Sequence, residues 1–396
     1  MLLLVLRGWV VLCFVLLIVT SVVSLIYSKN SFTLSKRERL VIVFFVAAFL
    51  SPLLTYILGD FTVEETTNLV HNLAFLGFVP VFLLVKRNGL PKQAFWYGIV
   101  IGAMITGISA LVEVTVLNHS RATGGHHHII YGDHALLLAM LSLLAFSFFK
   151  EKGKFYLLLP ILGLFLGLMA SVLSTARGSW IVFPVFLLIV AIFFRQLGSI
   201  RTRLTYLLAF VFLAIFAYAI PQTEIKDRID QAISDIHNYQ TGIKKSTSVG
   251  LRFEMWRASK ELVVENPITG IGLHQYPHKI KELVDSSNTY EKAIGRFAHP
   301  HNEYLYALVE RGVIGLFTIL PILLYPMYLF FRSLHGNNRP DRSIAIAGLL
   351  ITTGYAIFGL TESIFNRPTT INYYTMMMAL LLGSLYSRSA GSAERA

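Results

Sequence analysis

Cysteine is nearly absent from this chain of 396 residues, since Cys13 is the only one. A single cysteine excludes an intramolecular disulfide framework and a metal site built on cysteine thiolates. Charged residues are also scarce, at 14% of the sequence, whereas hydrophobic residues make up 55%. Soluble domains carry about a quarter charged residues and fewer apolar ones. The composition therefore predicts an all-α polytopic membrane protein rather than a set of soluble domains.

Long apolar runs recur along the whole chain, and most approach the length of about 20 residues that a helix needs to cross a bilayer. We count eleven of them, or twelve if residues 1–27 form two short helices around Arg7 and Gly8. No small-residue cleavage site follows the first run, which favours a retained span over a removed signal peptide. The predicted spans are residues 5–27, 40–59, 69–85, 94–117, 134–149, 155–173, 179–194, 204–220, 313–331, 343–360 and 371–386.

Basic residues dominate the charge, with 34 Lys and Arg against 22 Asp and Glu and a formal net charge of +12. They concentrate in alternate loops, which the positive-inside rule assigns to the cytoplasm. The other loops, including the long segment 221–303, then face outward. The excess charge is thus a topology signal, and no nucleic-acid partner is predicted. The basic positions are Lys29, Lys36, Arg37, Arg39, Lys86, Arg87, Lys92, Lys150, Lys152, Lys154, Arg195, Arg201, Arg203, Arg332, Arg339, Arg342, Arg388 and Arg395.

The segment 221–303 is the only large one outside the predicted spans. Isoleucines at helical spacing predict an amphipathic helix over 228–236, and a polar linker follows it. A second helix is predicted over 251–265, ended by Asn266-Pro267. Its inward residues are Trp256, Leu262 and Val263. The chain then divides into an N-terminal transmembrane bundle, 1–220, a large outer helical loop, 221–303, and C-terminal transmembrane helices with a cytoplasmic tail, 304–396.

A titratable histidine, His301, stands just before an apolar run long enough to enter a membrane. If residues 301–315 form one helix, Gly312 and Gly315 lie near the same face as His301, where glycine allows another helix backbone to come close. Because an imidazole titrates near neutral pH, His301 can act as a general base. A capping or hydrogen-bonded interfacial histidine accounts for the residue equally well.

Two arginines of the outer loops have the chemistry to bind a phosphate. Arg177 lies in a tight turn between two apolar runs, where it is either an anion clamp or a snorkelling interfacial side chain. Arg252 opens the predicted second helix of the outer loop, and its simplest interpretation is a neighbour of Glu254 on a solvated surface helix. A guanidinium suits phosphate because its fork donates two parallel hydrogen bonds and keeps its charge.

Metal binding is a weaker hypothesis. The cluster of His126, His127 and His128 with Asp133 and His134 contains metal-ligand residue types, but adjacent histidines point in different directions. A second acidic cluster, which could bind a divalent ion, consists of Asp60, Glu64 and Glu65. The sequence contains no Walker motif, no dinucleotide-binding glycine pattern and no nucleophile elbow. Because the cytoplasmic loops are too short to bind a nucleotide, the substrate is expected from the outer side or from the lipid.

Three stretches together resemble the O-antigen ligase/polymerase superfamily of bacterial inner-membrane glycosyltransferases. In one, His301-Asn302 is followed by nine residues, Gly312, two residues and Gly315. The second is Ser174-Thr175-Ala176-Arg177-Gly178, and the third is the outer loop with Arg252 that ends at 266–272. The resemblance covers about 170–320 and extends elsewhere by topology, although that family usually has twelve spans with both ends inside. The loop details are closer to the lipopolysaccharide O-antigen ligases than to the polymerases.

This resemblance implies a GT-C-like fold in the bacterial inner membrane, with the active site facing the periplasm and no metal or other cofactor. The implied donor is O-antigen linked to undecaprenyl diphosphate, and the implied acceptor is lipid A–core, with inversion at the anomeric carbon. Carried over by motif, Arg177 and Arg252 bind the donor diphosphate, and His301 activates the acceptor hydroxyl. Asn302, Gly312 and Gly315 belong to the supporting motif. The oligomeric state is not predicted.

Two alternatives remain open at this point. An O-antigen polymerase or a protein oligosaccharyltransferase of the same superfamily would share these residues and differ in its acceptor. A lipid-linked glycan transporter would also carry outer arginines. It should show paired halves with broken helices near the midplane, which the sequence does not show, and it would need no histidine base.

Overall fold

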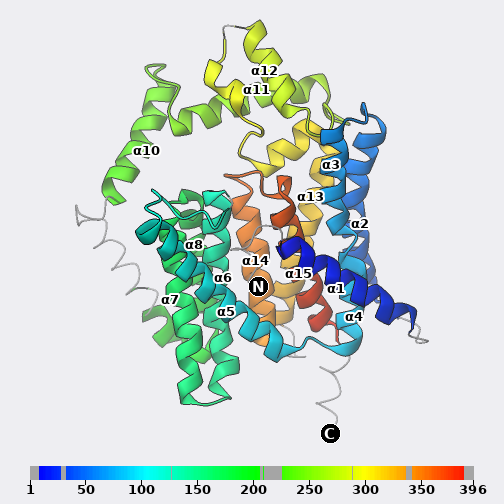
Figure 1. The fold of residues 1–396 in the computed structure, drawn as a ribbon, viewed down its shortest axis with the longest axis vertical. Helices are drawn as coiled ribbons and strands as arrows, with labels where there is room; N and C mark the ends of the chain where they lie inside the picture. The colour runs from blue at the N-terminus through cyan, green and yellow to red at the C-terminus, as the bar shows by residue number, and fades with distance from the viewer. Residues whose placement is uncertain are drawn as a thin grey trace. The chain divides into compact units, whose positions relative to one another are not determined.

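The computed structural model describes residues 9–27, 33–125, 127–205, 208, 225–287, 289–335 and 341–387. These residues form helices and connecting loops without any strand, which confirms the all-α prediction (Figure 1). Seven helices are long and apolar enough to cross a membrane, and two shorter apolar helices, Gly178–Phe193 and Arg342–Phe358, accompany them. The protein is therefore a multi-pass membrane protein. The predicted span 204–220 lies almost entirely outside the described residues.

The chain divides into two compact units. Unit 1 comprises Met1–Leu50, Val70–Gln196 and Leu320–Ala396, and unit 2 comprises Ser51–Leu69 and Leu197–Ile319. Three helices continue from one unit into the other along the chain, namely α2 (Lys36–Ile57), α3 (Val63–Asn72) and α13 (Glu303–His335).

Unit 1 contains most of the apolar helices. They are α1 (Trp9–Ile26), α4 (Phe78–Asn88), α5 (Lys92–Leu111), α6 (His128–Lys150), α7 (Leu158–Leu173), α8 (Arg177–Phe193), α14 (Arg342–Phe358) and α15 (Pro368–Leu385). Short helical turns adjoin them at η2 (Leu73–Phe75), η3 (Val112–Val116), η4 (Lys154–Leu157), η5 (Arg195–Leu197) and η8 (Ile364–Asn366).

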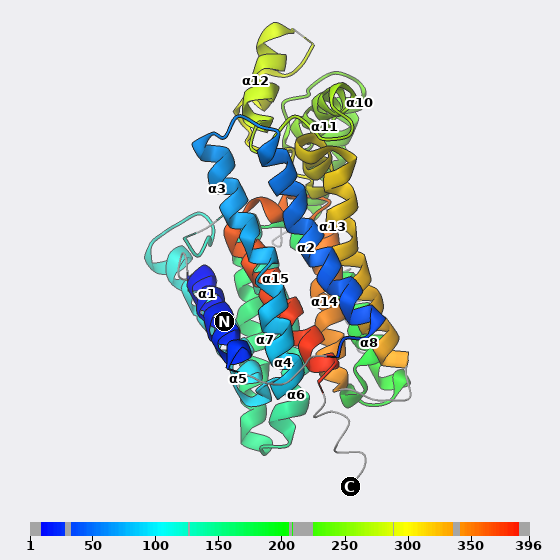
Figure 2. The same ribbon diagram turned by 90° about the vertical axis from the view of Figure 1, so that its right-hand side faces the viewer.

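Helix α6 is one of the most deeply buried helices of unit 1. It packs against α5, α7, α8 and α14, and Figure 1 shows α5, α6 and α7 side by side. Its apolar residues surround the helix instead of forming one stripe, as expected for a helix in the centre of a bundle. Elsewhere in this unit α15 packs along α4 (Figure 2). Phe78 of α4 also stacks on Phe45 of α2, with the ring centroids 4.0 Å apart.

Unit 2 has an amphipathic helical core of its own. It consists of α10 (Ile225–Gln240), α11 (Ser248–Glu265), α12 (Tyr276–Ser286), η7 (Lys292–Arg296) and the first turns of α13. The helix predicted over 251–265 is confirmed as α11, which begins after the Thr247 cap. Helix α10 packs against α11. The apolar cluster that joins α11, α12, η7 and α13 consists of Leu251, Met255, Ala258, Leu262, Tyr276, Ile280, Val284, Tyr290, Ile294, Tyr306 and Val309, with Trp256 and Val263 packed against it. Helix α12 was not among the predicted elements.

Candidate active site

His301 lies in the turn before α13. Its backbone has a φ of 51°, in the left-handed region, and the helix begins only at Glu303. Asn302 caps the helix, because its side-chain oxygen accepts a hydrogen bond from Leu305 N at 3.0 Å and its carbonyl accepts one from Tyr306 N at 2.9 Å. The expectation of a helix that starts at His301 is therefore wrong. The cap lets the imidazole project from a fixed turn instead.

A cavity of about 350 Å³ opens in unit 2 beside this histidine. It brings together His301 with two guanidinium-bearing residues, Arg252 from α11 and Arg296 from the end of η7. Arg296 was not recognised from the sequence. The residues that line the cavity are Ser246, Ser248, Leu251, Arg252, Met255, Arg296, Phe297 and His301. Guanidiniums are suited to bind anions and an imidazole to transfer protons, so this cavity gathers side chains that could do both.

Aromatic contacts and one hydrogen bond hold the histidine turn against α11. The indole Nε1 of Trp256 donates to the carbonyl of Pro300 at 2.9 Å. The ring of His299, which is buried, lies 4.6 Å from the ring of His301 at an angle of 67°. The ring of Phe297 also contacts His301, with the ring centroids 5.7 Å apart. Because Trp256 and Arg252 are one helical turn apart, the same helix positions both the arginine and the histidine turn.

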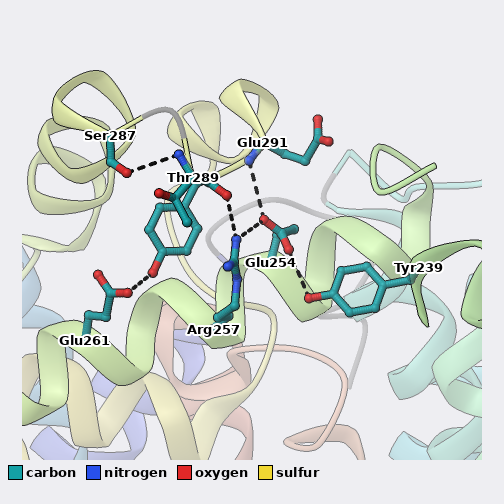
Figure 3. Close-up of polar contacts among 8 residues, drawn as sticks. Tyr239, Glu254, Arg257, Glu261, Ser287, Thr289 and Glu291 are labelled. Carbon is teal, nitrogen blue, oxygen red and sulfur yellow. Dashed lines mark hydrogen bonds and ion pairs between the residues drawn. The ribbon is translucent and has the colours of Figure 1, made fainter. Parts of the chain in front are cut away.

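The other face of α11 carries a polar network that includes Glu254 (Figure 3). This carboxylate is fully buried and accepts hydrogen bonds from the Tyr239 hydroxyl at 2.9 Å and from Arg257 at 2.7 Å. Arg257 also donates to the Thr289 carbonyl at 2.8 Å and lies over the Tyr290 ring. Glu254 is thus a buried acceptor at the centre of a network. The simplest interpretation of Arg252 placed it beside Glu254 on a solvated helix surface. That interpretation is wrong, because Glu254 is buried.

Two tyrosines of this network have shifted pKa values. Burial and the nearby Glu261 carboxylate, to which the Tyr290 hydroxyl donates, raise the pKa of Tyr290 to about 12. Burial and Glu254 likewise raise the pKa of Tyr239. Both hydroxyls therefore stay protonated at neutral pH and serve as donors, Tyr239 of α10 to Glu254 and Tyr290 to Glu261 of α11.

Gly312 interrupts α13, with φ of 62° and ψ of −159°. A Cβ at this position would lie 2.1 Å from the carbonyl oxygen of Ile268. The segment around Ile268 pairs with α13 through hydrogen bonds from Ile271 N to Val309 O at 2.9 Å and from Val313 N to Pro267 O at 2.9 Å. The expected close approach at Gly312 is thus to a loop backbone, and the expected continuous helix over 301–315 is wrong.

Gly315 lies one turn beyond the interruption. A Cβ at Gly315 would come within 2.5 Å of the Arg311 side chain, so the helix is tightly packed on itself here. Arg311 is buried, and its guanidinium lies 4.0 Å from the buried carboxylate of Glu303. Charged residues inside an apolar helix are rare and pair with one another. This pair belongs to the turns that follow His301.

Arg177 is the first residue of α8 in unit 1, and its side chain lies outside the described part of the structure. The residues around this helix start are buried and polar. Ser179 donates to Asp133 of α6 at 2.7 Å, and both residues are fully buried. A Cβ on Gly178 would lie 2.9 Å from Thr361 Oγ1. The predicted role of Arg177 stays a prediction.

Both clusters that the sequence suggested for metal binding contain a residue with a structural role. His134 is fully buried, and its ring nitrogens contact the Ile130 carbonyl and the Tyr355 hydroxyl, each at 2.8 Å. Glu65 accepts from Thr62 N at 3.0 Å and from Gln275 at 3.1 Å, so it caps α3. His134 and Glu65 therefore already have protein partners. His126 lies outside the described residues.

A comparison with known proteins supports the resemblance that the sequence indicated. Residues 162–320 match the family model described as O-Antigen ligase. For residues 162–320, this match confirms the resemblance to the O-antigen ligase superfamily. The match to this superfamily runs from α7 into α13 and includes every residue that the sequence predicted for the site. Over 371 residues the chain is also 28% identical to an uncharacterized protein of Haemophilus influenzae, with 92% of each chain covered.

Proposed function

We propose that this protein is an O-antigen ligase, which transfers an O-antigen glycan from undecaprenyl diphosphate to lipid A–core on the periplasmic side of the inner membrane. The observation that supports the proposal best is the cavity that Arg252, Arg296 and His301 share in unit 2. A ligase that uses a lipid diphosphate donor needs cations for the leaving group and a base for the acceptor. The cavity offers both kinds of group.

In the proposed reaction, an imidazole nitrogen of His301 takes the proton of the acceptor hydroxyl. The oxygen attacks the anomeric carbon of the donor from the face opposite the diphosphate, so that the new glycosidic bond has inverted configuration. The bond between that carbon and the diphosphate oxygen breaks, and its electron pair leaves on the diphosphate. Arg252 and Arg296 neutralise the charge that builds there. The products are the extended lipid A–core and undecaprenyl diphosphate, and the proton remains on the imidazole until solvent removes it.

Arg177 keeps its predicted role as a further ligand of the donor diphosphate, which rests on the resemblance of its turn to the superfamily motif. Substitution of Arg177 by alanine is expected to abolish transfer while the protein still inserts. The proposal assigns no metal to this reaction, so transfer is expected to survive EDTA. Loss of transfer in EDTA with rescue by Mg²⁺ or Zn²⁺ would contradict that part.

The test is complementation of a strain from which the gene is deleted. The deletion is expected to leave lipid A–core without O-antigen, while full-length glycan accumulates on undecaprenyl diphosphate. Wild type should restore the lipopolysaccharide ladder, whereas Arg252→Gln, Arg296→Gln and His301→Ala should not. Lys260→Gln is the matched control, since Lys260 is an exposed cation on α11 that does not line the cavity, and it should behave as wild type.

Other outcomes point to other functions. Core capped with a single repeat unit in the deletion strain would indicate an O-antigen polymerase. Normal lipopolysaccharide together with loss of glycosylated proteins would indicate a protein oligosaccharyltransferase. Accumulation of the lipid-linked glycan on the cytoplasmic side would indicate a transporter. A normal ladder in the His301→Ala strain would remove His301 from the site.

A further inference from the structure

A second and larger cavity, of about 810 Å³, lies in unit 1. Its walls come from the segment that leads into α2, from Lys86 near the end of α4 and from Tyr386 just after α15. The positive-inside rule predicts a cytoplasmic location for all three of these chain segments. The lining residues are Thr33, Leu34, Ser35, Lys36, Arg37, Glu38, Lys86 and Tyr386.

Part of this wall is held in place by buried polar contacts. Ser35 and Glu38 cap each other, with Ser35 N donating to the Glu38 carboxylate at 2.7 Å and Glu38 N donating to Ser35 Oγ at 3.4 Å. Lys86 forms an ion pair with Glu38 and donates to the Thr33 carbonyl at 2.8 Å. The charge of Glu38 is therefore matched by Lys86, and the segment 33–38 is fixed against α4.

Two positive charges then remain at the cavity, on Lys36 and Arg37. Both side chains are exposed, and no carboxylate among the described residues forms an ion pair with either. Tyr386 adds a neutral hydroxyl that can donate a hydrogen bond. An ammonium, a guanidinium and a hydroxyl around one cavity are suited to an anionic phosphate group.

The exposed face of α2 extends this arrangement along the helix. Lys36, Val43 and Leu50 follow one another at intervals of seven residues, so they lie on nearly the same face. Val43 is 56% exposed and Leu50 is 50% exposed. A cationic group at one end and uncovered apolar side chains below it match a phospholipid, whose charged headgroup is joined to acyl chains. A free phosphate would use only the charged end.

We propose that this cavity binds the headgroup of an anionic phospholipid, with an acyl chain along the Lys36–Leu50 face of α2. This cavity shares no lining residue with the cavity that contains His301, so the proposal does not depend on the proposed ligase reaction. Basic pockets between transmembrane helices on the cytoplasmic side commonly serve such headgroups. The lipid would fix the positions of α2, α4 and α15 relative to one another at that end of unit 1.

Native mass spectrometry of the delipidated full-length protein tests this site. Phosphatidylglycerol and phosphatidylcholine with the same acyl chains are added separately. Wild type should bind phosphatidylglycerol more tightly, and Lys36→Gln/Arg37→Gln should weaken that binding about 30-fold, because each basic residue contributes about 1 kcal/mol toward anionic lipid. Binding of phosphatidylcholine should stay unchanged.

The control is Lys150→Gln/Lys154→Gln, which removes two exposed charges from another predicted cytoplasmic loop of the same unit. It should retain wild-type binding of phosphatidylglycerol. Equal weakening by both double variants would overturn the proposal, because the attraction would then be non-specific. Complete displacement of the lipid by millimolar inorganic phosphate would also overturn it, since the site would then recognise free phosphate only. An unchanged melting temperature in both variants shows that the fold is intact.

Discussion

The side-chain oxygen of Asn302 accepts a hydrogen bond from the backbone N–H of Leu305 at 3.0 Å, directly after the left-handed turn at His301. The residue beside the proposed base therefore has a mechanical role, which is to end the turn and start α13. This relationship explains why a small polar residue follows the histidine. The effect of losing the Asn302 cap can therefore be tested separately from the effect of losing the His301 imidazole.

Asn302→Ala is expected to destabilise the protein by about 1 kcal/mol, the usual cost of losing an N-cap. It should also lower glycan transfer, because the turn that presents His301 loses its anchor. Asn302→Ser should retain both properties, since serine is an equally good cap. The measurements are the melting temperature of the purified protein and transfer in a complemented strain. A fully active alanine variant would show that the cap does not position the histidine.

Gly312→Ala is expected to lower the free energy of unfolding by about 3 kcal/mol, because the backbone conformation at Gly312 is nearly restricted to glycine. The added Cβ would also collide with the Ile268 carbonyl. Gly242→Ala is the matched control, since Gly242 has a positive φ of 74° but open space around its Cβ. It should cost only about 1–2 kcal/mol. Similar losses in thermal stability for both variants would mean that the pairing of α13 with 267–271 contributes little.

The stability of unit 2 is expected to fall at alkaline pH through Tyr290. Its pKa is about 12 in the folded protein and about 10 in an unfolded chain. Because the folded state holds this proton more tightly, the contribution is complete below pH 10 and disappears as the pH rises through 12. Melting temperatures measured from pH 8 to pH 11 should therefore decline more steeply for wild type than for Tyr290→Phe. Parallel declines would contradict this assignment.

Much of the architecture follows from local sequence patterns. Apolar length predicted eleven or twelve membrane spans, and the described residues contain seven helices long and apolar enough to cross a membrane, with two shorter apolar ones. Apolar spacing predicted α11 to within three residues of its observed start at Ser248. The residues expected to face inward, Trp256, Leu262 and Val263, do pack on the apolar cluster of unit 2. These features could be predicted because the spacing of apolar residues within one helix indicates which of its faces is buried.

The remaining features depend on contacts between distant parts of the chain. Hydrophobic periodicity continues through Gly312 and gives no sign of the interruption, where the loop backbone at Ile268 lies against the helix. Arg296 reaches the cavity with Arg252 only because α12 and η7 return the chain to α11. Such placements require knowledge of the path of the intervening residues, which a single sequence does not contain.

Removing one partner of the buried ion pair between Glu303 and Arg311 should lower the free energy of unfolding more than replacing both partners. Glu303→Gln leaves the Arg311 guanidinium buried without its full countercharge, which typically costs about 3–5 kcal/mol. The double variant Glu303→Gln/Arg311→Met removes both charges and should recover most of that loss.

An exposed ion pair in the same unit, Lys279 with Glu282 at 2.9 Å, is the control, since Lys279→Met should lower the free energy of unfolding by less than about 1 kcal/mol. The measurement is the thermal unfolding of each purified variant. If Glu303→Gln is no more damaging than Lys279→Met, the pair does not hold the first turns of α13 together, and the position of His301 must depend on its cap and on Trp256 alone.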